Sequence, residues 1–569
     1  MSSKKALIDV LTASGVDAQD AASLANLEAP SGGSWTNEVL NSGKADEQKL
    51  AAELARFSKT PFLSLDGSRI ERGILQILPS RFVFKHLILP VAVEGGRVQL
   101  ATWDVFNSTA RRLAVQELPG KKVTWAISPR SALIRTIKTL YGVGAETFDE
   151  ILQTTRTYEG DSRDETQDIT SDDPEASVIK FVNQIIREAI HERATDIHVE
   201  PLENDLRIRY RIDGILHEVA VPPQLRVLQS AIISRLKVMA HMDIAERRLP
   251  QDGSINLNTA NGLIDVRVST IPTVNGESIS LRLLSRTETL SFGLDRLDMS
   301  QSQLSTIRKL LLQPNGIILV TGPTGSGKST SLYSFLTSIN SVSRRIITIE
   351  EPVEYRLPGV SQIDVKPEIG LTFASGLRAI LRQDPNIVMV GEIRDAETAE
   401  IAIRAAMTGH LVFSTLHTND AVSAITRLLD MGIEPFLLAS VVRCFLAQRL
   451  VRTICNVCKE ETTHPPEYLE EVGAPFASDF RFHHGRGCDH CRHTGYRGRA
   501  AIYEIVQVNE ALRRMIVRKE TGSAMKARAV ADGMETLRQD GWRRVMKAQT
   551  TLEEVIRVTQ IDETLTETD

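Results

Sequence analysis

The sequence predicts an α/β protein built around a phosphate-binding loop, or P-loop. Residues 322–330 fill every position of the G-x-x-x-x-G-K-S pattern. The apolar run 317–320 precedes the loop and indicates a buried strand, and residues 331–336 indicate the start of a helix. A strand, a glycine-rich loop and a helix in this order are the context that a phosphate site requires.

The loop residues have the chemistry that a nucleotide needs. They are Gly322, Pro323, Thr324, Gly325, Ser326, Gly327, Lys328, Ser329 and Thr330. Glycines let backbone N–H groups surround phosphates, and the helix N-terminus adds partial positive charge. Lys328 can reach the β- and γ-phosphates, and Ser329 is placed to ligate Mg²⁺. The loop therefore predicts ATP and Mg²⁺ as ligands, against the alternative of a glycine-rich turn that fits the pattern by chance.

Size and composition exclude several classes of protein. A chain of 569 residues has enough material for several domains. Its net charge of −5 and its 5% of aromatic residues lack the basic, aromatic character of a nucleic-acid-binding surface, so we expect no nucleic-acid partner. The apolar runs are far shorter than the roughly 20 residues that span a bilayer, and no signal peptide is predicted. We therefore expect a cytoplasmic protein that meets a membrane only through partners.

Composition and periodicity divide the chain into seven segments. They are an N-terminal helical segment (1–60), an α/β docking module (61–145), an acidic flexible linker (146–175), a second α/β domain (176–295), the P-loop domain (296–454), a cysteine-bearing insert (455–491) and a C-terminal helical region (492–569). A hairpin signature at 87–101 supports the docking module. Eight acids within residues 159–175 support the linker, and alternating strands at 206–212 and 278–284 support the second α/β domain.

Acidic residues follow two predicted strands of the P-loop domain. Residues 345–349 indicate one strand, which is followed by Glu350 and Glu354, and residues 387–390 indicate another, which is followed by Glu392. Acids at strand ends near a P-loop can hold Mg²⁺ or its waters and polarise the attacking water. Many P-loop enzymes place aspartate before the glutamate of the second acidic strand, where this chain has Gly391 before Glu392. The alternative is a set of ordinary surface acids.

A histidine stands just beyond a third predicted strand. It is His417, in the segment 409–419. A neutral imidazole there could sense the γ-phosphate or link it to a neighbouring strand. A structural histidine is the alternative, and the residues alone favour that interpretation.

Four of the five cysteines form two C-x-x-C pairs. They are Cys455, Cys458, Cys488 and Cys491, with 29 residues between the pairs. Four thiolates suit tetrahedral Zn²⁺ and leave no open position for catalysis, so we expect a structural zinc site. Four reduced thiols or a redox pair are the alternatives, and His490 and His493 are rival ligands. Cys444 stands in an apolar run and is interpreted as a core residue.

The ordered motifs resemble those of the secretion ATPase superfamily over about residues 176–510. The resemblance rests on the P-loop, an acidic box at 348–355, a second acidic strand at 390–395, a histidine box at 409–419 and the segment 378–385. The cysteine insert and the long N-terminal region look like those of the type II secretion ATPase and its relative, the type IV pilus extension ATPase. Pilus-retraction motors usually lack both features.

The resemblance implies a RecA-like P-loop domain preceded by a PAS-like domain. It also implies a homo-hexameric motor, peripheral on the cytoplasmic face of an inner membrane. By this analogy, ATP hydrolysis drives pseudopilus assembly in type II secretion, and pilus extension is the alternative. The implied partners are an inner-membrane platform protein and a membrane-anchored docking protein.

The same resemblance assigns roles to individual side chains. Glu350 and Glu392 are expected to activate water and organise Mg²⁺. Glu354 is a second candidate, because the residue after Glu350 is glutamate where the family usually has aspartate. Arg267 and Arg282 match positions expected to reach the nucleotide and stabilise the charge of the leaving phosphoryl group. Ordinary strand arginines are the alternative.

Two other function classes compete with the motor. One is a DNA-translocating ATPase with a zinc finger, against which the acidic charge balance weighs. The other is a nucleotide-gated regulator without turnover, which a hydrolysis measurement would distinguish. Residues 40–43 and Leu50 match only part of a cyclic-dinucleotide motif, so no such ligand is predicted.

Overall fold

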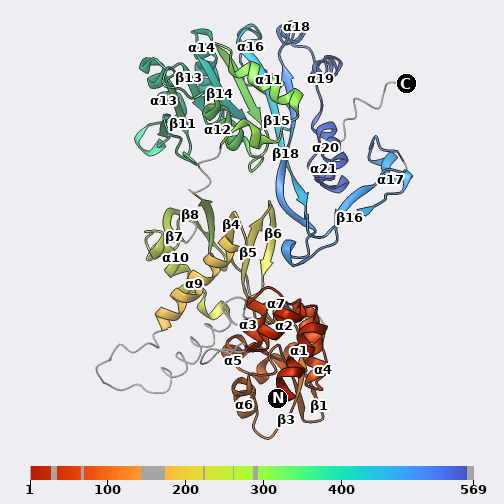
Figure 1. Cartoon of the computed structure of the whole chain (residues 1–569). Helices are drawn as coiled ribbons and strands as arrows, with labels where there is room; N and C mark the ends of the chain where they lie inside the picture. Colours follow the sequence, from red (N-terminus) through yellow and green to blue (C-terminus); the bar gives the residue numbers. More distant parts are fainter. Residues whose placement is uncertain are drawn as a thin grey trace. The chain divides into compact units, whose positions relative to one another are not determined.

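The computed structural model divides into two compact units (Figure 1). Unit 1 comprises Met1–Leu257 and Asp265–Leu284, and unit 2 comprises Asn258–Ile264 and Ser285–Asp569. The structure describes residues 2–26, 35–65, 70–142, 174–221, 225–259, 262–285, 292–477 and 479–559. The predicted acidic linker lies outside the described residues, except for Pro174 and Glu175, which begin a helix.

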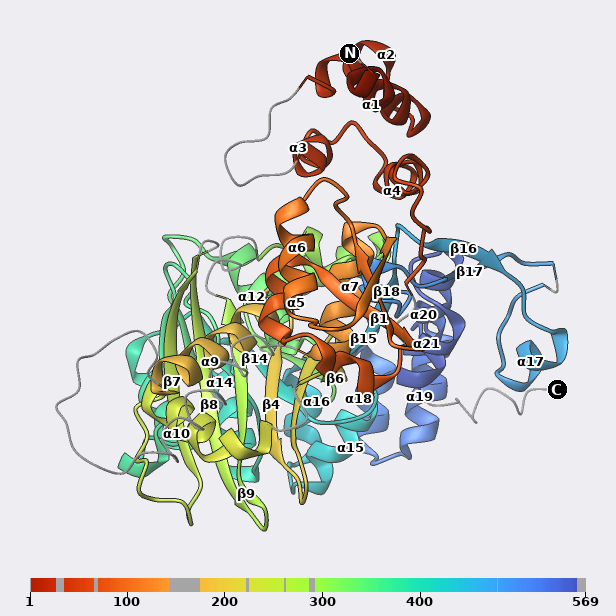
Figure 2. The same ribbon diagram turned by 90° about the horizontal axis from the view of Figure 1, so that it is seen from below.

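Unit 1 begins with four helices that share one apolar core (Figure 2). These helices are α1 (Ser2–Ala13), α2 (Ala18–Leu24), α3 (Trp35–Asn41) and α4 (Glu47–Phe57). Asp17 and Asp46 cap α2 and α4 by accepting hydrogen bonds from backbone N–H groups of the first turn. The described part of the predicted N-terminal segment is thus largely helical.

A three-stranded sheet follows in unit 1. It contains β1 (Ile88–Glu94), β2 (Arg97–Thr102) and β3 (Lys122–Ile127), accompanied by α5 (Ser80–His86), α6 (Ser108–Gln116) and α7 (Arg130–Tyr141). The strands β1 and β2 form the predicted antiparallel hairpin, and β2 and β3 are parallel. Gly95 and Gly96 make the hairpin turn with φ of 54° and 78°, which glycine adopts readily.

The second sheet of unit 1 has six strands in the order β6-β5-β4-β9-β8-β7. Its elements are α9 (Pro174–His191), β4 (Asp196–Pro201), β5 (Leu206–Ile212), β6 (Ile215–Val219), α10 (Gln229–Met239), β7 (Gln251–Thr259), β8 (Gly262–Thr273) and β9 (Gly276–Ser285). The Tyr210 hydroxyl of β5 donates to the Ile185 carbonyl oxygen at 2.9 Å and so ties α9 to the sheet. The strands expected at 206–212 and 278–284 are confirmed.

Unit 2 is organised on a seven-stranded sheet with the order β12-β11-β13-β14-β10-β15-β18. The strands are β10 (Gly316–Thr321), β11 (Ile346–Glu350), β12 (Ser361–Asp364), β13 (Ile387–Val390), β14 (Leu411–Leu416), β15 (Val442–Ile454) and β18 (Tyr496–Gln507). The first six are parallel in sheet order, and β18 is antiparallel to β15. The carboxyl ends of these six neighbouring strands therefore meet at one edge of the sheet, where α/β proteins commonly bind ligands.

Apolar side chains on both faces of this sheet pack against helices. Ile317 and Leu319 of β10 face one core, and Ile318 and Val320 face the other. The helices are α11 (Gln301–Leu311) and α12 (Lys328–Ile339) on the second core, and α13 (Phe373–Ile380), α14 (Ala396–Met407), α15 (Ser423–Asp430) and α16 (Pro435–Val441) on the first. Cys444 lies in the second core, where burial raises the pKa of its thiol to about 12, so the interpretation of this residue is confirmed.

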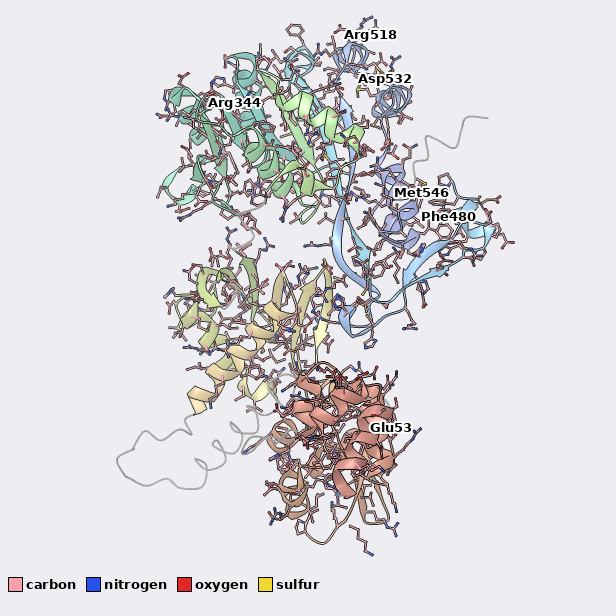
Figure 3. All side chains as sticks on the ribbon, in the orientation of Figure 1. Glu53, Arg344, Phe480, Arg518, Asp532 and Met546 are labelled. Atoms are coloured by element: carbon pink, nitrogen blue, oxygen red, sulfur yellow. The ribbon has the colours of Figure 1, made fainter. Side chains whose placement is uncertain are left out.

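The cysteine insert joins β15 to β18. It contains β16 (Lys459–Thr462), α17 (Pro466–Glu471) and β17 (Phe482–Gly485). Four helices follow β18, namely α18 (Glu510–Val517), α19 (Gly522–Ala531), α20 (Leu537–Met546) and α21 (Leu552–Val558). Phe476 of the insert packs edge-on against Trp542 of α20, with ring centroids 5.8 Å apart, in the region where Figure 3 labels Phe480 and Met546. The insert and the C-terminal helices thus share an aromatic contact.

Short 3₁₀ turns complete the described part of the chain. They lie at Arg72–Ile77, Leu225–Leu228, Leu294–Leu297, Pro367–Ile369, Leu381–Gln383 and Asp489–Cys491. Within the described ranges, every helix is too short or too polar to cross a membrane.

A buried carboxyl group joins three elements of unit 2. Glu504 of β18 is 1% exposed and accepts hydrogen bonds from the backbone N–H groups of Ala421 at 2.9 Å and Leu537 at 3.3 Å. Burial raises the pKa of Glu504 to about 7, with Asp420 adding to the increase and Lys526 opposing it.

We expect Glu504 to make the stability of unit 2 fall as the pH rises. Between about pH 4.5 and pH 7 the folded protein holds a proton that the unfolded chain has lost. The Glu504→Gln variant should therefore lose less of its Tm than the parent between pH 5 and pH 8. Glu470→Gln, at an exposed position of α17, serves as the control. Parallel losses of Tm in the parent and in Glu504→Gln would contradict this.

Candidate functional site

The P-loop joins β10 to the N-terminus of α12, as the sequence predicts. Gly325 and Gly327 have φ of 79° and 86°, in the left-handed region that favours glycine. A Cβ atom on Gly327 would lie 2.8 Å from Nε2 of Gln448 on β15. A larger residue would therefore displace the Gln448 side chain and strain the backbone, which glycine avoids.

Lys328 is 9% exposed and lies inside the loop. Its Nζ atom donates to the carbonyl oxygens of Gly322 at 2.7 Å and Pro323 at 3.1 Å. Burial lowers the pKa of Lys328 to about 8, Glu392 opposes this shift and Arg449 adds to it. A phosphate oxygen beside Nζ would favour the charged form of the lysine.

Ser326 gives a second sign that the loop suits an anion. Its Oγ atom is buried, and in the described part of the chain it has no hydrogen-bond partner. Buried hydroxyl groups are normally hydrogen-bonded, so an acceptor such as a phosphate oxygen would satisfy this one. The residues of the loop therefore fit a nucleotide phosphate.

The strand β15 connects the P-loop to the segment after β14. Ser331 Oγ of α12 donates to Oε1 of Gln448 at 2.8 Å. The next residue, Arg449, donates to the carbonyl oxygen of Asn419 at 2.6 Å. Sequence reasoning assigned no role to these two β15 residues, because their contacts depend on which strand lies beside β10.

Glu350 ends β11 and is 5% exposed. Its carboxylate accepts hydrogen bonds from the hydroxyl of Tyr333, from Thr348 Oγ1 at 2.6 Å and from Gln362 Nε2 at 3.1 Å. Burial raises the pKa of Glu350 above its ordinary value, although all three donors act in the opposite direction. Both carboxylate oxygens are thus held by protein donors, as expected of a group that fixes local structure.

Glu392 follows β13 and meets His417, which follows the neighbouring strand β14. Oε2 of Glu392 lies 3.3 Å from Nε2 of His417, and Oε1 accepts a hydrogen bond of 2.5 Å from Arg394. Burial alone would raise the pKa of Glu392, but Arg394 and His417 outweigh it and lower the pKa. Arg394 also contacts Glu351 of the acidic box, 2.6 Å between NH1 and Oε2.

The structure therefore brings together three of the predicted groups. Lys328, Glu392 and His417 each follow one of three neighbouring parallel strands, which are β10, β13 and β14 in the sheet order β13-β14-β10. The charge of Glu392 acts on Lys328, and its oxygen contacts His417. His417 thus contacts the residue that follows the neighbouring strand β13. Whether it senses the γ-phosphate or links that phosphate to the strand stays a prediction, as does its role in catalysis.

Arg267 and Arg282 belong to unit 1, whereas the P-loop belongs to unit 2. They lie on the adjacent strands β8 and β9. Arg282 Nε donates to Oδ1 of Asp196 on β4 at 3.1 Å. The approach of these arginines to a nucleotide stays a prediction.

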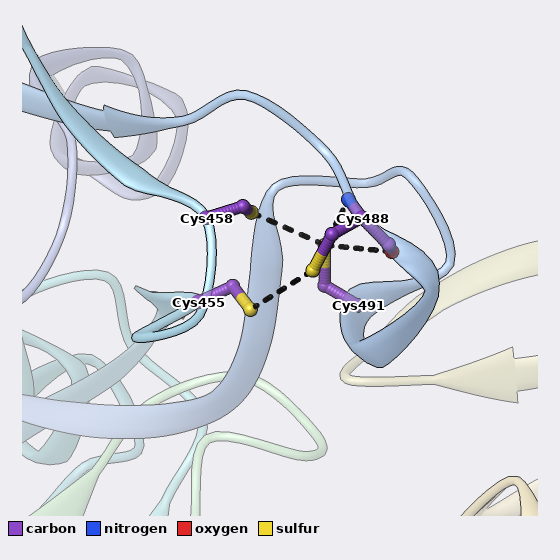
Figure 4. Close-up of side chains that lie close together, drawn as sticks. All are labelled: Cys455, Cys458, Cys488 and Cys491. Carbon is purple, nitrogen blue, oxygen red and sulfur yellow. Dashed lines mark hydrogen bonds between the residues drawn. The ribbon is translucent and has the colours of Figure 1, made fainter. Parts of the chain in front are cut away.

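The four paired cysteines converge at one point (Figure 4). All four sulfur atoms lie within 4.8 Å of one another, and three of the pairs are separated by 3.6 to 3.8 Å. Four thiolates around one tetrahedral Zn²⁺ at 2.3 Å lie about 3.8 Å apart. In the described ranges this is the one group of three or more histidine, cysteine or acidic residues with such spacing, and it includes neither His490 nor His493. The sulfur positions therefore fit a zinc ion.

Backbone N–H groups also prepare one of these thiols to bind metal. Cys491 Sγ accepts from the N–H groups of Cys488 at 3.2 Å and Gly495 at 3.3 Å. Burial opposes ionisation of Cys491, but these N–H groups outweigh it and lower the pKa of the thiol to about 7. Thiolate is the form that binds metal.

Sequence reasoning missed two side chains of the acidic region. Tyr333 lies on α12, in a run that gives only a helical signal, yet its hydroxyl reaches Glu350. Arg394 stands between acids in the segment 390–395. A single cation among acids could have indicated the ion pairs that Arg394 makes with Glu351 and Glu392.

Two family models match the chain. The type II/IV secretion system protein family matches residues 171–557, which is more than half of the sequence. The MshEN domain matches residues 58–147.

Known proteins resemble the chain over most of its length. The type IV pilus assembly ATPase PilB of Myxococcus xanthus is 40% identical over 533 residues, covering 92% of this chain and 93% of the relative. Type II secretion system protein E of Aeromonas hydrophila is 50% identical over 398 residues, covering 70% of this chain and 79% of the relative. The crystal structure of the pilus retraction motor PilT with bound ADP is 27% identical, with a TM-score of 0.46, and covers 68% of this chain and 98% of PilT.

Gly391 stands where many P-loop enzymes have aspartate, and the structure predicts that only glycine fits there without cost. A Cβ atom at this position would lie 3.3 Å from Cα of Glu350 and 3.3 Å from the carbonyl oxygen of Ile349. Both are backbone atoms of β11, which cannot yield easily, so Gly391→Ala should lower the free energy of unfolding by about 1–3 kcal/mol.

Denaturant unfolding measures this loss. Gly293→Ala is the matched control, because its Cβ would meet nothing within 4 Å and its φ of −158° suits any residue. The control should change stability by less than about 0.5 kcal/mol. Equal stabilities of the two variants would contradict the packing argument.

Proposed function

This chain belongs to the type II/IV secretion system protein family of ATPases, and from that premise we propose that it is the ATP-driven motor of pseudopilus assembly in type II protein secretion. In this proposal unit 2 carries a RecA-like P-loop domain, and the six-stranded sheet of unit 1 belongs to a PAS-like domain. The observation that carries the proposal is the meeting of Lys328, Glu392 and His417 at the carboxyl edge of one parallel sheet.

Each group at that edge has a distinct task in ATP hydrolysis. The P-loop N–H groups and Lys328 bind the β- and γ-phosphates and stabilise negative charge as the terminal phosphoryl group leaves. Ser329 would hold Mg²⁺, which would neutralise part of the phosphates' charge. Glu392 orders the metal's surroundings while Arg394 and His417 hold its carboxylate in place.

A carboxylate of the acidic box takes a proton from the attacking water. Both oxygens of Glu350 already accept hydrogen bonds from Tyr333, Thr348 and Gln362, which supports a positioning task for Glu350. Glu354, four residues after Glu350 in the same box, is then the residue that we assign to the water.

ATP binding and hydrolysis move the domain at 176–295 against the P-loop domain. Arg267 and Arg282 reach the nucleotide when the two domains close and stabilise the leaving phosphoryl group. Six copies form a ring, so that these movements act in sequence on a membrane platform protein. The motor works in the cytoplasm at the inner membrane, where residues 61–145 bind a membrane-anchored docking protein.

A second candidate is the extension of a type IV pilus by the same engine. The match to the pilus assembly ATPase, which covers 92% of this chain, favours it. The higher identity of 50% to a type II secretion protein supports the first candidate. Export of secreted enzymes and growth of pili, compared in a strain that lacks the gene, distinguish the two.

The tetracysteine cluster holds a structural zinc ion in this proposal. The sulfur spacing of 3.6 to 3.8 Å supports tetrahedral coordination by Cys455, Cys458, Cys488 and Cys491. When bound, the zinc ion would cross-link the two ends of the cysteine insert. The cysteines join the start of the insert, after β15, to its end, before β18.

Lys328→Ala should abolish the motor's reaction. Loss of the ammonium group removes charge stabilisation beside the phosphates, so ATP turnover should fall by about 100-fold or more, together with export. Phosphate release by the purified protein and export by the complemented strain measure the two effects. Lys309→Ala, at an exposed position of α11, is the control and should retain both. Unchanged turnover in Lys328→Ala would exclude the proposed function, and turnover that rises only with DNA would favour a DNA translocase.

The purified chain should contain about one Zn²⁺, and a variant with both Cys455→Ser and Cys488→Ser should contain none. Elemental analysis measures the metal, and chelation should lower the Tm because the ends of β15 and β18 lose their cross-link. Cys444→Ala removes a cysteine outside the cluster and should keep its metal. Full metal content in the double variant would show that the cysteines do not bind it.

A further inference from the structure

Tyr333 lies at the junction of the P-loop helix and the acidic box. It is the sixth residue of α12, which starts at Lys328, and its side chain is 0% exposed. Its hydroxyl donates a hydrogen bond to Oε2 of Glu350 and accepts one from the backbone N–H of Glu354 at 3.2 Å. One oxygen atom thus contacts the carboxylate of Glu350 and the backbone of Glu354, and it comes from the element that begins with Lys328.

The ring of Tyr333 is fixed as firmly as its hydroxyl. Phe292 packs edge-on against it, with centroids 5.5 Å apart, and Tyr355 does so at 6.1 Å. Phe292 and Tyr355 also contact each other at 5.5 Å. Edge-on aromatic packing restricts ring movement, so the hydroxyl has little freedom to leave the acidic box.

The other donors to Glu350 both come from the sheet. Thr348 belongs to the same strand as Glu350, and Gln362 belongs to the neighbouring β12. Gln362 also donates to the carbonyl oxygen of Tyr355 at 2.9 Å, which fixes the far end of the box. Among the described donors to Glu350, Tyr333 is the one that comes from the P-loop helix.

We propose that Tyr333 is a positioning residue for ATP hydrolysis, which sets the distance between the acidic box and the P-loop through its bonds to Glu350 and Glu354. The proposal rests on the proposed function, because it assigns the water-activating group to the acidic box. Tyr333 touches neither nucleotide nor water in this role. It holds the Glu350 carboxylate and the Glu354 backbone, and so places the acidic box where a water can attack the terminal phosphate.

A positioning role predicts a loss of kcat with little change in nucleotide binding. Tyr333→Phe keeps the ring and its aromatic contacts but loses the hydroxyl bridge. Misplacement of a catalytic group by a fraction of an ångström to 1 Å is costly, so kcat should fall roughly 10- to 100-fold. The phosphates still meet an intact P-loop, so KM for ATP and the Kd for a non-hydrolysable ATP analogue should change by less than about threefold.

Two further variants separate positioning from simple destabilisation. Tyr210→Phe removes another buried tyrosine hydroxyl bond, to the Ile185 carbonyl oxygen in unit 1, and should lower the Tm without lowering kcat. Thr348→Val removes one donor to Glu350 but leaves the bridge from α12 intact, so its kcat should fall less than that of Tyr333→Phe.

Steady-state phosphate release and analogue binding, measured on the full chain, test the positioning role of Tyr333. A selective fall of kcat in Tyr333→Phe supports the proposal. Parental kcat in Tyr333→Phe, or equal losses in Thr348→Val and Tyr333→Phe, would overturn it. Lys328→Ala is measured beside them: if it is inactive while Tyr333→Phe has parental kcat, only the role of Tyr333 fails. If Lys328→Ala keeps parental activity, the proposed function itself fails.

Discussion

The Nζ atom of Lys328 contacts the carbonyl oxygens of Gly322 and Pro323 inside a loop that excludes most water. A buried ammonium group is costly unless charges or hydrogen bonds compensate it, and burial lowers the pKa of Lys328 to about 8. Glu392 supplies opposing charge from a nearby strand, and Arg394 and His417 hold Glu392 in turn. The carboxyl edge of the sheet is thus a connected electrostatic system, in which a phosphate beside Lys328 would be stabilised.

The long strand β15 links this edge to the tetracysteine cluster. Gln448 of β15 contacts the P-loop helix through Ser331, and Cys455 directly follows the end of the same strand. The antiparallel strand β18 returns from the cluster and carries Glu504, which bonds to the N-terminus of α20. The candidate nucleotide site, the metal centre and the C-terminal helices therefore depend on one pair of strands. A cross-link at the far end of this pair stabilises the strand that packs beside the P-loop.

Local patterns in the sequence were enough to predict the P-loop, its flanking strand and helix, the β1–β2 hairpin and the pairs of cysteines, because each depends on neighbouring residues. The meeting of Glu392 and His417 could not be predicted from local patterns, since it requires β13 and β14 to be neighbours in the sheet. The bond from Tyr333 to Glu350 gave no local signal, because it joins α12 to β11 across 17 positions of the sequence. The sequence pattern also could not predict the crowding around Gly391, because that crowding comes from the backbone of β11.

Hydrolysis in the proposed motor requires Glu392 to act on ATP that Lys328 has already bound. The most direct test is to measure bound and cleaved ATP in one sample of Glu392→Gln, by mixing the protein with radiolabelled ATP and Mg²⁺ and following a single turnover. The variant should retain ATP with about the parental Kd. It should cleave ATP at least about 100-fold more slowly than the parent, because the amide lacks the carboxylate charge. Glu368→Gln, at an exposed position, should cleave at the parental rate. Cleavage at the parental rate by Glu392→Gln would contradict the account.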